Sequence, residues 1–311
     1  MMVTFKRNRL KRVLIIILSV ILTHCAVSMV ATKVIYDSIF DRYDPASEVA
    51  EVPRQEHSFS CDGLQLAGYL YDSGENRRDT LVVLAPGFHA GGDDYLPQIQ
   101  SLTDKGWPVF TFDPSGSCDS EGESYRGFPQ EIADLDAALR YVEENDRFGC
   151  QSIALLGHSR GGYAAGCILN YGHDIDAVIS VSGVNSAMDG IMGYSTEYIG
   201  PLAYGNYGFL WAYQAMLFGA EMTDLQAHEQ IENSQVPVLV VHGAADEAFP
   251  PDEYSIYAHR QEITRPGVEY LLLEEPGQNG HTDLLFDGQE GANEELMEQI
   301  SAFLERSTSH E

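Results

Sequence analysis

Basic residues are scarce in this chain. Its 311 residues include 18 lysines and arginines against 47 aspartates and glutamates, so the formal net charge is −29 at pH 7. Six of the basic residues precede the first acid, Asp37, which leaves the remainder more acidic still. Such a surface repels nucleic acid and anionic lipid headgroups. We therefore exclude nucleic-acid binding and interpret the charge as a property of a soluble, extracellular body.

Cysteine is also sparse, with five residues in the chain. No Cys-x-x-Cys pair or His/Cys cluster occurs, so we expect no zinc site, no other metal site and no cofactor. Cys61, Cys118, Cys150 and Cys167 follow the N-terminal segment, and in an oxidising compartment they permit two disulfides in three alternative pairings. Alternatively some are small buried hydrophobes, which we favour for Cys167.

Residues 1–33 are interpreted as a targeting segment. Five basic residues lead into an apolar stretch, Val13 to Thr32, that is just long enough to span a bilayer with its basic flank on the cytoplasmic side. We rank an uncleaved membrane anchor first and a cleaved signal peptide second. Third is a lipoprotein signal ending at Cys25, for which His24 is a poor fit. All three place the remaining chain outside the cytoplasm.

The rest of the chain divides into a linker, residues 34–56, and one domain, residues 57–311. Short apolar strands alternate with helical patterns in this domain, which predicts a mostly parallel sheet covered on both faces. Expected strands are 58–61, 64–71, 80–85, 108–112, 152–158, 177–181, 236–241 and 268–273, and expected helices are 95–105, 131–144, 252–260 and 293–304.

A segment without strand pattern, about residues 184–235, interrupts this alternation. It is rich in tyrosine, phenylalanine and methionine. A connection of this length in a compact domain usually has a function. We interpret it as a helical cap over the site, although ordinary packing onto the sheet explains any single aromatic residue.

The most informative motif is Gly157-His158-Ser159-Arg160-Gly161, which follows an apolar strand and precedes a helical pattern. This is the context of a nucleophile elbow, in which a serine sits on a turn too sharp for bulky neighbours. Gly157 and Gly161 therefore have a steric reason to be glycine. The motif predicts that Ser159 is a catalytic nucleophile.

A serine nucleophile needs a base and an acid that orients the base, and in this architecture they follow in the order nucleophile, acid, histidine. Asp246 follows the strand 236–241, and His281 follows the last strand. Both lie beyond the carboxyl ends of parallel strands, where sites form in such sheets. We predict Asp246 and His281 as the triad partners, with Glu247 as a rival acid.

The developing oxyanion requires two backbone donors. We predict the amide of Arg160, directly after the nucleophile, and the amide of Phe88 in the loop that follows the strand 80–85. Gly87 lets the backbone approach closely. His89, Asp93 and Asp94 in this region suggest a metal, but no matching ligands occur elsewhere in the sequence.

From about His57 onward the chain resembles the α/β-hydrolase superfamily, especially its monoglyceride-lipase and serine-aminopeptidase-like branch. The matching segments are Pro86-Gly87-Phe88, Phe112 to Gly116, Asp119 to Gly122, Gly157 to Gly162, His242 to Asp246 and Gly280-His281. The chain departs from the usual pattern with Pro86 before Gly87 and with Pro114-Ser115 in the second segment. The resemblance implies an α/β-hydrolase fold with a helical cap insertion and hydrolysis of an acyl bond.

The function expected from these residues is hydrolysis of small-molecule acyl esters through an acyl-enzyme, as in carboxylesterases and lipases. The apolar cap favours an apolar acyl or aryl group. One alternative is a peptidase of the proline-aminopeptidase type, for which Asp189, Glu197, Glu221 and Asp224 are candidate ligands of a free amine. Another is an inactive surface binding protein, which would be expected to lack a triad member.

Overall fold

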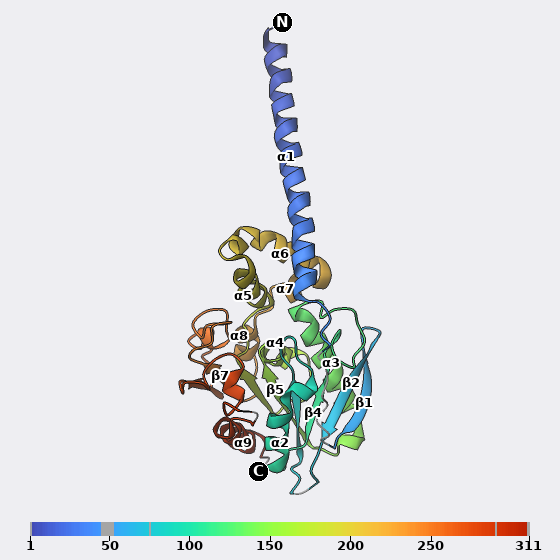
Figure 1. Cartoon of the computed structure of the whole chain (residues 1–311), viewed down its shortest axis with the longest axis vertical. Coiled ribbons are helices and arrows are strands. Elements are labelled where there is room, and N and C mark those ends of the chain that lie inside the picture. The colour runs from blue at the N-terminus through green and yellow to red at the C-terminus, as the bar shows by residue number, and fades with distance from the viewer. Residues whose placement is uncertain (1, 45–52, 75, 290, 310–311) are drawn as a thin grey trace.

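The computed structural model describes residues 2–44, 53–74, 76–289 and 291–309 and is centred on an eight-stranded sheet (Figure 1). The strand order is β1-β2-β4-β3-β5-β6-β7-β8. β1 and β2 pair antiparallel, as do β2 and β4, and the remaining pairs are parallel. The strands are β1 Gln55–Cys61, β2 Leu64–Tyr71, β3 Thr80–Ala85, β4 Val109–Phe112, β5 Ser152–His158, β6 Ala177–Val181, β7 Val238–Gly243 and β8 Val268–Leu273.

Helices cover both faces of the sheet. The central strands are runs of valine, leucine, isoleucine and alanine that are buried almost throughout, as expected for parallel strands between two helical layers. One hydrophobic cluster joins the sheet to α3 (Phe128–Glu143), α4 (Arg160–Cys167) and α8 (Ala227–Glu232). The other joins it to α2 (Leu96–Asp104) and α9 (Glu294–Thr308). The predicted α/β-hydrolase fold is therefore confirmed.

The helix expected at 252–260 is reduced to a single 3-10 turn, η4 (Tyr257–His259). Tyr254 adopts a left-handed conformation with φ of 52°, which a helix does not tolerate. The hydroxyl of Ser255 accepts a hydrogen bond from the amide of Ala258 at 3.0 Å, so a side chain competes with helical pairing. Hydrophobic periodicity alone predicts neither effect.

The segment between β6 and β7 consists of helices that stand beside the carboxyl edge of the sheet (Figure 1). They are α5 (Ala187–Ile199), α6 (Leu202–Phe218), α7 (Ala220–Thr223) and α8. The Ser186 hydroxyl caps α5 by accepting from the amide of Asp189 at 3.0 Å. Gly200, with φ of 58°, and Pro201 separate α5 from α6. We refer to α5, α6 and α7 together as the cap.

A single long helix, α1 (Met2–Ile39), projects from the body beside the cap (Figure 1). Its residues Lys11–Ile39 are long and apolar enough to cross a membrane. The helix does not end at residue 33, where the sequence places the end of the targeting segment. Tyr36, Ile39 and Phe40 are buried against α6, α3 and neighbouring loops, so the start of the predicted linker belongs to the folded core. Residues 45–52 of that linker lie outside the described residues.

All five cysteines are free, so none of the three disulfide pairings is formed. Cys61 and Cys167 are buried, and Cys167 lies in α4 as a small hydrophobic residue of the core. Burial raises the pKa of both thiols above the ordinary range. Both thiols are therefore protonated and unreactive at neutral pH.

Candidate active site

Ser159 occupies the sharp turn between β5 and α4. Its φ of 54° and ψ of −114° lie in a region that residues other than glycine rarely adopt. A Cβ atom on Gly157 would collide with the carbonyl oxygen of Gly161, and one on Gly161 would collide with that of Ala85. Both glycines therefore have the steric role that the sequence predicts. The turn holds the Ser159 side chain above the carboxyl edge of the sheet.

Ser159, His281 and Asp246 are joined by two hydrogen bonds. The Nε2 atom of His281 lies 2.8 Å from the Ser159 hydroxyl oxygen, and its Nδ1 atom lies 2.7 Å from Oδ2 of Asp246. These residues follow β5, β7 and β8, so three loops at one edge of the sheet bring together positions up to 122 residues apart in sequence. Ser159 and Asp246 are buried, and the His281 side chain is 17% exposed.

Asp246 is held as a carboxylate by a dense set of donors. Its Oδ1 accepts from the amides of Ala248 at 3.0 Å and Phe249 at 2.9 Å. Its Oδ2 lies 3.2 Å from Nε2 of His242, a second histidine that sequence analysis did not single out. Burial by itself would raise the pKa of Asp246, but the hydrogen bonds from His242, His281 and Phe249 outweigh it and hold this pKa well below its usual range.

The loop after β3 lies beside the Ser159 turn. The amide of Gly87 donates to the hydroxyl of Tyr95 at 2.9 Å and is therefore not free to face a substrate. The next amide is that of Phe88, whose residue lines the pocket at Ser159. Arg160 is the first residue of α4, where the amides have no partner within the helix. Of the two amides that the sequence nominates, that of Phe88 belongs to a residue lining the pocket at Ser159, and that of Arg160 directly follows Ser159 in the chain.

Tyr95 and His158 connect this loop to the rest of the site. The Tyr95 hydroxyl lies 2.8 Å from Nδ1 of His158, and Nε2 of His158 lies 3.0 Å from the carbonyl oxygen of His281. Burial and the neighbouring His281 lower the pKa of His158 to about 3, so its ring is neutral. Sequence analysis named His158 only as part of the elbow motif and did not consider Tyr95, because their partners are distant in sequence.

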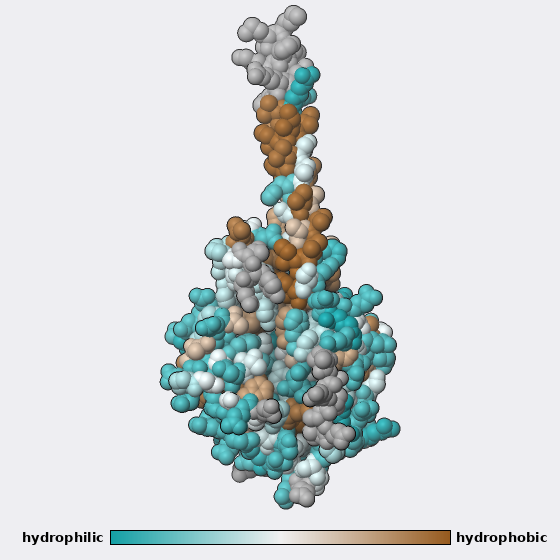
Figure 2. All heavy atoms as spheres, viewed as in Figure 1, coloured by the Kyte–Doolittle hydropathy of each residue, from teal (hydrophilic) through white to brown (hydrophobic). Residues whose placement is uncertain are grey.

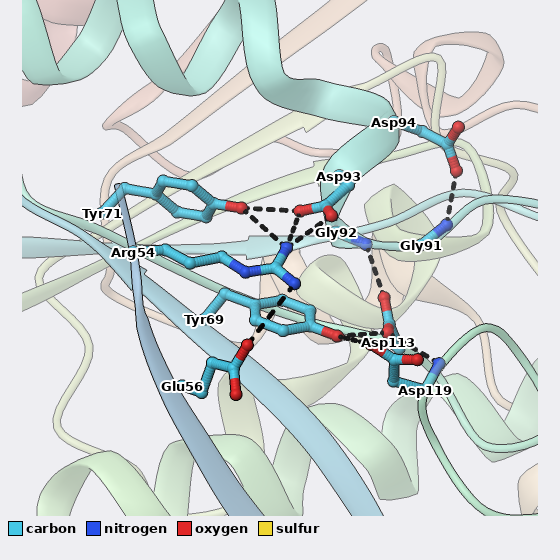
Figure 3. Close-up of polar contacts among 10 residues, drawn as sticks. All are labelled: Arg54, Glu56, Tyr69, Tyr71, Gly91, Gly92, Asp93, Asp94, Asp113 and Asp119. Atoms are coloured by element: carbon cyan, nitrogen blue, oxygen red, sulfur yellow. Dashed lines mark hydrogen bonds and ion pairs between the residues drawn. The ribbon is translucent and has the colours of Figure 1, made fainter. Parts of the chain in front are cut away.

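A buried polar network fixes the short 3-10 helix η1 (Gly92–Tyr95), which carries Tyr95 (Figure 3). The guanidinium of Arg54 stacks 3.8 Å from the ring centre of Tyr69 and pairs with Asp93. The amide of Gly92 donates to Asp113 at 2.9 Å, and the Tyr69 hydroxyl donates to the same carboxylate at 2.8 Å. Asp93, which the sequence analysis discounted as a metal ligand, pairs with Arg54.

The side chain of Arg160 points away from the pocket lining into the core, where it forms an ion pair with Glu131 of α3. Both side chains are fully buried, and the guanidinium lies 4.5 Å from the ring centre of Tyr125. A charge in this position requires its partner, because an isolated buried ion is very costly. The pair anchors the first residue of α4 directly beside the Ser159 turn.

A pocket of about 350 Å³ opens at Ser159. Its lining is mostly aromatic and apolar, and it includes Tyr194 from the cap. One carboxylate, Asp94, lies in the lining and accepts a hydrogen bond from the amide of Gly91 at 2.7 Å. Lining residues are Phe88, His89, Ala90, Asp94, Tyr95, His158, Ser159, Tyr194, His281, Thr282, Leu285 and Phe286.

Other acids named from the sequence lie outside this pocket lining. Asp189 accepts from Ser186 at the start of α5, and Asp224 accepts from the indole of Trp211 at 2.7 Å. Glu221 and Glu247 are exposed. The side chain of Glu197 lies outside the described residues. Pro114 and Ser115 do not line the pocket either, so the departure from the family pattern at these positions does not alter its floor.

Among the described residues, one group of side chains has the composition of a metal site, and none of its members lines the pocket at Ser159. His228 of α8, together with His259 and Glu262 of the β7–β8 connection, places ligand atoms within 4.8 Å of one another. The two imidazoles stack with ring centres 4.1 Å apart. Sequence analysis did not find this group, because no spacing rule links position 228 to 259.

The relationship of this chain to known protein families follows from its match to a family model. The model of the prolyl oligopeptidase family matches residues 94–311, which include Ser159, Asp246 and His281. The chain belongs to the prolyl oligopeptidase family. This confirms the predicted serine hydrolase of the α/β-hydrolase superfamily. The narrower resemblance to the monoglyceride-lipase branch stays a prediction. A comparison with curated protein sequences found no match.

Solved structures of similar fold include esterases and a peptidase. Esterase Pf2001 from Pyrococcus furiosus is 18% identical with a TM-score of 0.66, over 87% of this chain and 100% of that one. Est1E from Butyrivibrio proteoclasticus, with ferulic acid bound, is 19% identical with a TM-score of 0.60, over 81% and 98%. An acylaminoacyl peptidase from Pyrococcus horikoshii is 16% identical with a TM-score of 0.62, over 83% and 42%. At these identities the likeness concerns the fold of this prolyl oligopeptidase family member.

Proposed function

We propose that this protein cleaves acyl esters through an acyl-enzyme formed on Ser159. The observation that carries the proposal is the hydrogen-bonded series from Ser159 through His281 to Asp246, at the base of a largely apolar pocket. A serine hydroxyl becomes a useful nucleophile only when an adjacent base removes its proton. In this role Ser159 is the nucleophile, His281 the base and Asp246 the residue that orients the base.

The proposed reaction begins when the Ser159 oxygen attacks the acyl carbon while its proton passes to Nε2 of His281. Asp246 holds the opposite ring nitrogen and stabilises the imidazolium that forms. The amides of Phe88 and Arg160 would donate to the oxyanion of the tetrahedral intermediate. When the intermediate collapses, His281 protonates the departing alcohol. A water molecule then repeats the sequence and releases the carboxylic acid and free Ser159.

The lining of the pocket supports an ester with an apolar acyl or aryl group. Phe88, Tyr194, Leu285 and Phe286 supply apolar surface, which is the usual lining of small-molecule pockets. An aminopeptidase would need a carboxylate free to bind the amine of its substrate. The one carboxylate of the lining, Asp94, is exposed, and one of its oxygens accepts from the amide of Gly91 in the cap of η1. Small-molecule esters are therefore the proposed substrates, and no cofactor is required by this chemistry.

A peptidase is the second candidate, and the observation that favours it is the family itself, which takes its description from prolyl oligopeptidase. The same three side chains cleave amides when the site binds a peptide. The two candidates differ in whether the enzyme turns over an anilide as readily as the matching ester.

We further propose that α1 anchors the enzyme in a membrane, with the catalytic domain on the extracytoplasmic side. The helix carries an apolar stretch whose side chains from Val13 to Leu22 are about half exposed or more, as expected for a surface that contacts lipid. The basic residues before it favour a cytoplasmic N-terminus. A cleaved leader, which would release a secreted enzyme, is the alternative, and sizing of the mature protein from membranes distinguishes the two.

The test uses the purified full-length protein in detergent. We expect a fluorophosphonate probe to label Ser159, with labelling lost in Ser159→Ala and His281→Ala. p-Nitrophenyl esters of increasing chain length should be turned over faster than p-nitroanilides of the same acyl groups. Faster turnover of aminoacyl anilides would favour the peptidase. Absence of labelling in folded protein would contradict both candidates.

A further inference from the structure

The cap helix α6 presents a large apolar surface to solvent. In a strongly acidic chain, no charged residue occurs between Glu197 and Glu221, and α6 lies entirely within this interval. Leu202 is 77% exposed, Met216 67% and Tyr204 60%, and Tyr207 is also exposed. Leu202 and Met216 are fourteen positions, about four turns, apart on the same side of α6, and exposed apolar side chains gathered on one side of a helix indicate an interaction site. The remaining surface of the body in Figure 2 is mostly hydrophilic.

The same helix packs against α1, alongside the apolar span. The ring of Phe209 lies 6.2 Å from that of His24, and the side-chain amide of Asn206 donates to the hydroxyl of Thr32 at 3.0 Å. His24 precedes Thr32 by two turns of helix, so the contact with Phe209 lies about 12 Å inside the end of the apolar stretch. Figure 2 shows the apolar surface of α1 continuing down to the cap.

This contact fixes the depth of the cap relative to the bilayer. When residues 13–32 of α1 occupy the hydrocarbon core, the His24–Phe209 contact lies about 12 Å inside it, so the Phe209 side chain of α6 reaches well into the acyl-chain layer. Interfacial helices bury an apolar face about 5–10 Å deep, so α6 inserts somewhat deeper at Phe209 than such helices usually do. The Tyr204 hydroxyl lies 2.8 Å from that of Tyr254 in the β7–β8 connection, so Tyr204 faces the body rather than the bilayer.

We propose that the exposed face of α6 is a membrane-docking surface, which seats the cap on the same bilayer that α1 crosses. The proposal rests on the membrane anchoring given under Proposed function. The occupant is the bilayer rather than a second copy of the chain, because α1 already brings lipid to this face. Docking is apolar rather than electrostatic, since α6 has no basic residue and the acidic body is repelled by anionic headgroups.

Docking would also place the cover of the active site at the membrane. Tyr194 of α5 lines the pocket at Ser159, and α5 packs against α6. At the end of α1, the ring of Phe40 lies 5.4 Å from that of Phe88 in the oxyanion loop. The membrane helix, the docking surface and the pocket therefore form one continuous packed assembly. Substrates of this site would be esters that partition into the bilayer.

The test measures the depth of individual positions in vesicles. The full-length chain with Trp107→Phe and Trp211→Phe is reconstituted into phosphatidylcholine vesicles whose acyl chains carry bromine near the headgroups. Single tryptophans are then introduced as Leu202→Trp, Met216→Trp and, as the matched control, Gln151→Trp. Gln151 is exposed at the opposite edge of the sheet, directly before β5. Fluorophosphonate labelling of Ser159 verifies folding of each variant.

We expect the brominated lipid to quench most of the fluorescence at positions 202 and 216 and none at position 151. If the chain with Trp107→Phe and Trp211→Phe does not fold, Leu202→Trp is introduced into the native chain instead. Its quenching is then measured as the increase over the quenching of Trp107 and Trp211. Protein that floats with the vesicles but is not quenched at 202 overturns the docking surface alone. A detergent-stable dimer that Leu202→Glu dissociates, again without quenching, assigns the face to a second copy. Failure to float with vesicles refutes the anchor and docking together, whereas ester turnover tests the catalytic proposal separately.

Discussion

The hydroxyl of Tyr95 lies 2.8 Å from Nδ1 of His158 and accepts a hydrogen bond from the amide of Gly87. Because the carbonyl oxygen of His281 can only accept, the neutral His158 ring carries its proton on Nε2, and Nδ1 accepts the proton of the Tyr95 hydroxyl. Nε2 in turn donates to the carbonyl oxygen of His281. One series of hydrogen bonds therefore joins the loop after β3, the turn that carries Ser159 and the loop that carries His281.

Tyr95→Phe should lower kcat about tenfold with little change in KM. The substitution leaves the Gly87 amide and Nδ1 of His158 without partners, and a buried unsatisfied group costs about 1–3 kcal/mol. The loop that carries Phe88 would relax away from the geometry required in the transition state. Steady-state kinetics on a p-nitrophenyl ester measure the effect. Tyr270→Phe is the matched control, because the Tyr270 hydroxyl has no partner among the described residues. Equal kcat values for the two variants would contradict a positioning role for Tyr95.

The free energy of unfolding should fall as the pH falls from 8 to 5, in part because of His158. Its pKa is about 3 in the folded protein against 6.5 as the ordinary value, so between these values the unfolded chain binds more protons. Stability is therefore lost on acidification, by about 2 kcal/mol at pH 5 from this residue. Asp246 adds nothing in this range, because a carboxylate with a lowered pKa loses its contribution only below about pH 4.

Denaturant unfolding of the detergent-solubilised protein at a series of pH values measures this dependence. His57, His89 and His228 also have lowered pKa values, so the difference between the wild type and His158→Gln isolates the residue of interest. The variant should show a shallower slope between pH 6.5 and 5. An unchanged slope would mean that His158 does not titrate in the way its burial requires.

Ser159→Gly should be more stable than Ser159→Ala. Both variants lack the nucleophile, but only glycine relieves the strain at φ of 54° and ψ of −114°. Backbone strain of this kind is on the order of 1–3 kcal/mol, and the greater entropy of glycine in the unfolded chain offsets about 1 kcal/mol of it. A higher midpoint of thermal unfolding for Ser159→Gly checks the expectation. A lower midpoint would show that the turn is not strained.

Local sequence patterns predicted the strands of the sheet better than they predicted the long-range contacts. The bounds of β2, β3, β6 and β8 match the expected apolar runs, because a buried strand needs only its own residues and its neighbours. Ser159 was identified for a similar reason, since the steric demands of its turn fall on Gly157 and Gly161 nearby. Chain order then nominated Asp246 and His281, and their hydrogen bonds are consistent with that choice.

The features that the sequence did not predict depend on contacts between residues far apart in the chain. Tyr95 meets His158 across 63 positions, and neither residue carries a local signal of the other. The end of α1 lies in the segment assigned to a linker, where polar and apolar residues are mixed, yet Tyr36 packs against α6, and Phe40 packs against α3 and the loop after β3. Burial against distant elements follows from the fold and is not visible in hydropathy.

Asp246→Asn should lower kcat by about 10⁴-fold, the effect expected when an amide replaces the carboxylate that orients a triad histidine. The loss arises because the amide favours the wrong tautomer of His281. Glu247→Gln is the control for the rival acid, and its exposed side chain should leave kcat unchanged. Esterase assays on both variants compare the two carboxylates directly. A large loss in Glu247→Gln with an active Asp246→Asn would reverse the assignment.

Glu131→Gln should destabilise the protein by about 3–5 kcal/mol, because it leaves the fully buried guanidinium of Arg160 without a counter-charge. The matched control is Glu269→Gln, which removes the partner of Arg306 in an exposed ion pair and should cost less than about 1 kcal/mol. Denaturant unfolding compares the two variants. The double variant Glu131→Leu with Arg160→Met should recover much of the loss, since an apolar pair of similar volume avoids the desolvation penalty. Equal stability of Glu131→Gln and Glu269→Gln would mean that the Arg160 charge finds another partner beside the Ser159 turn.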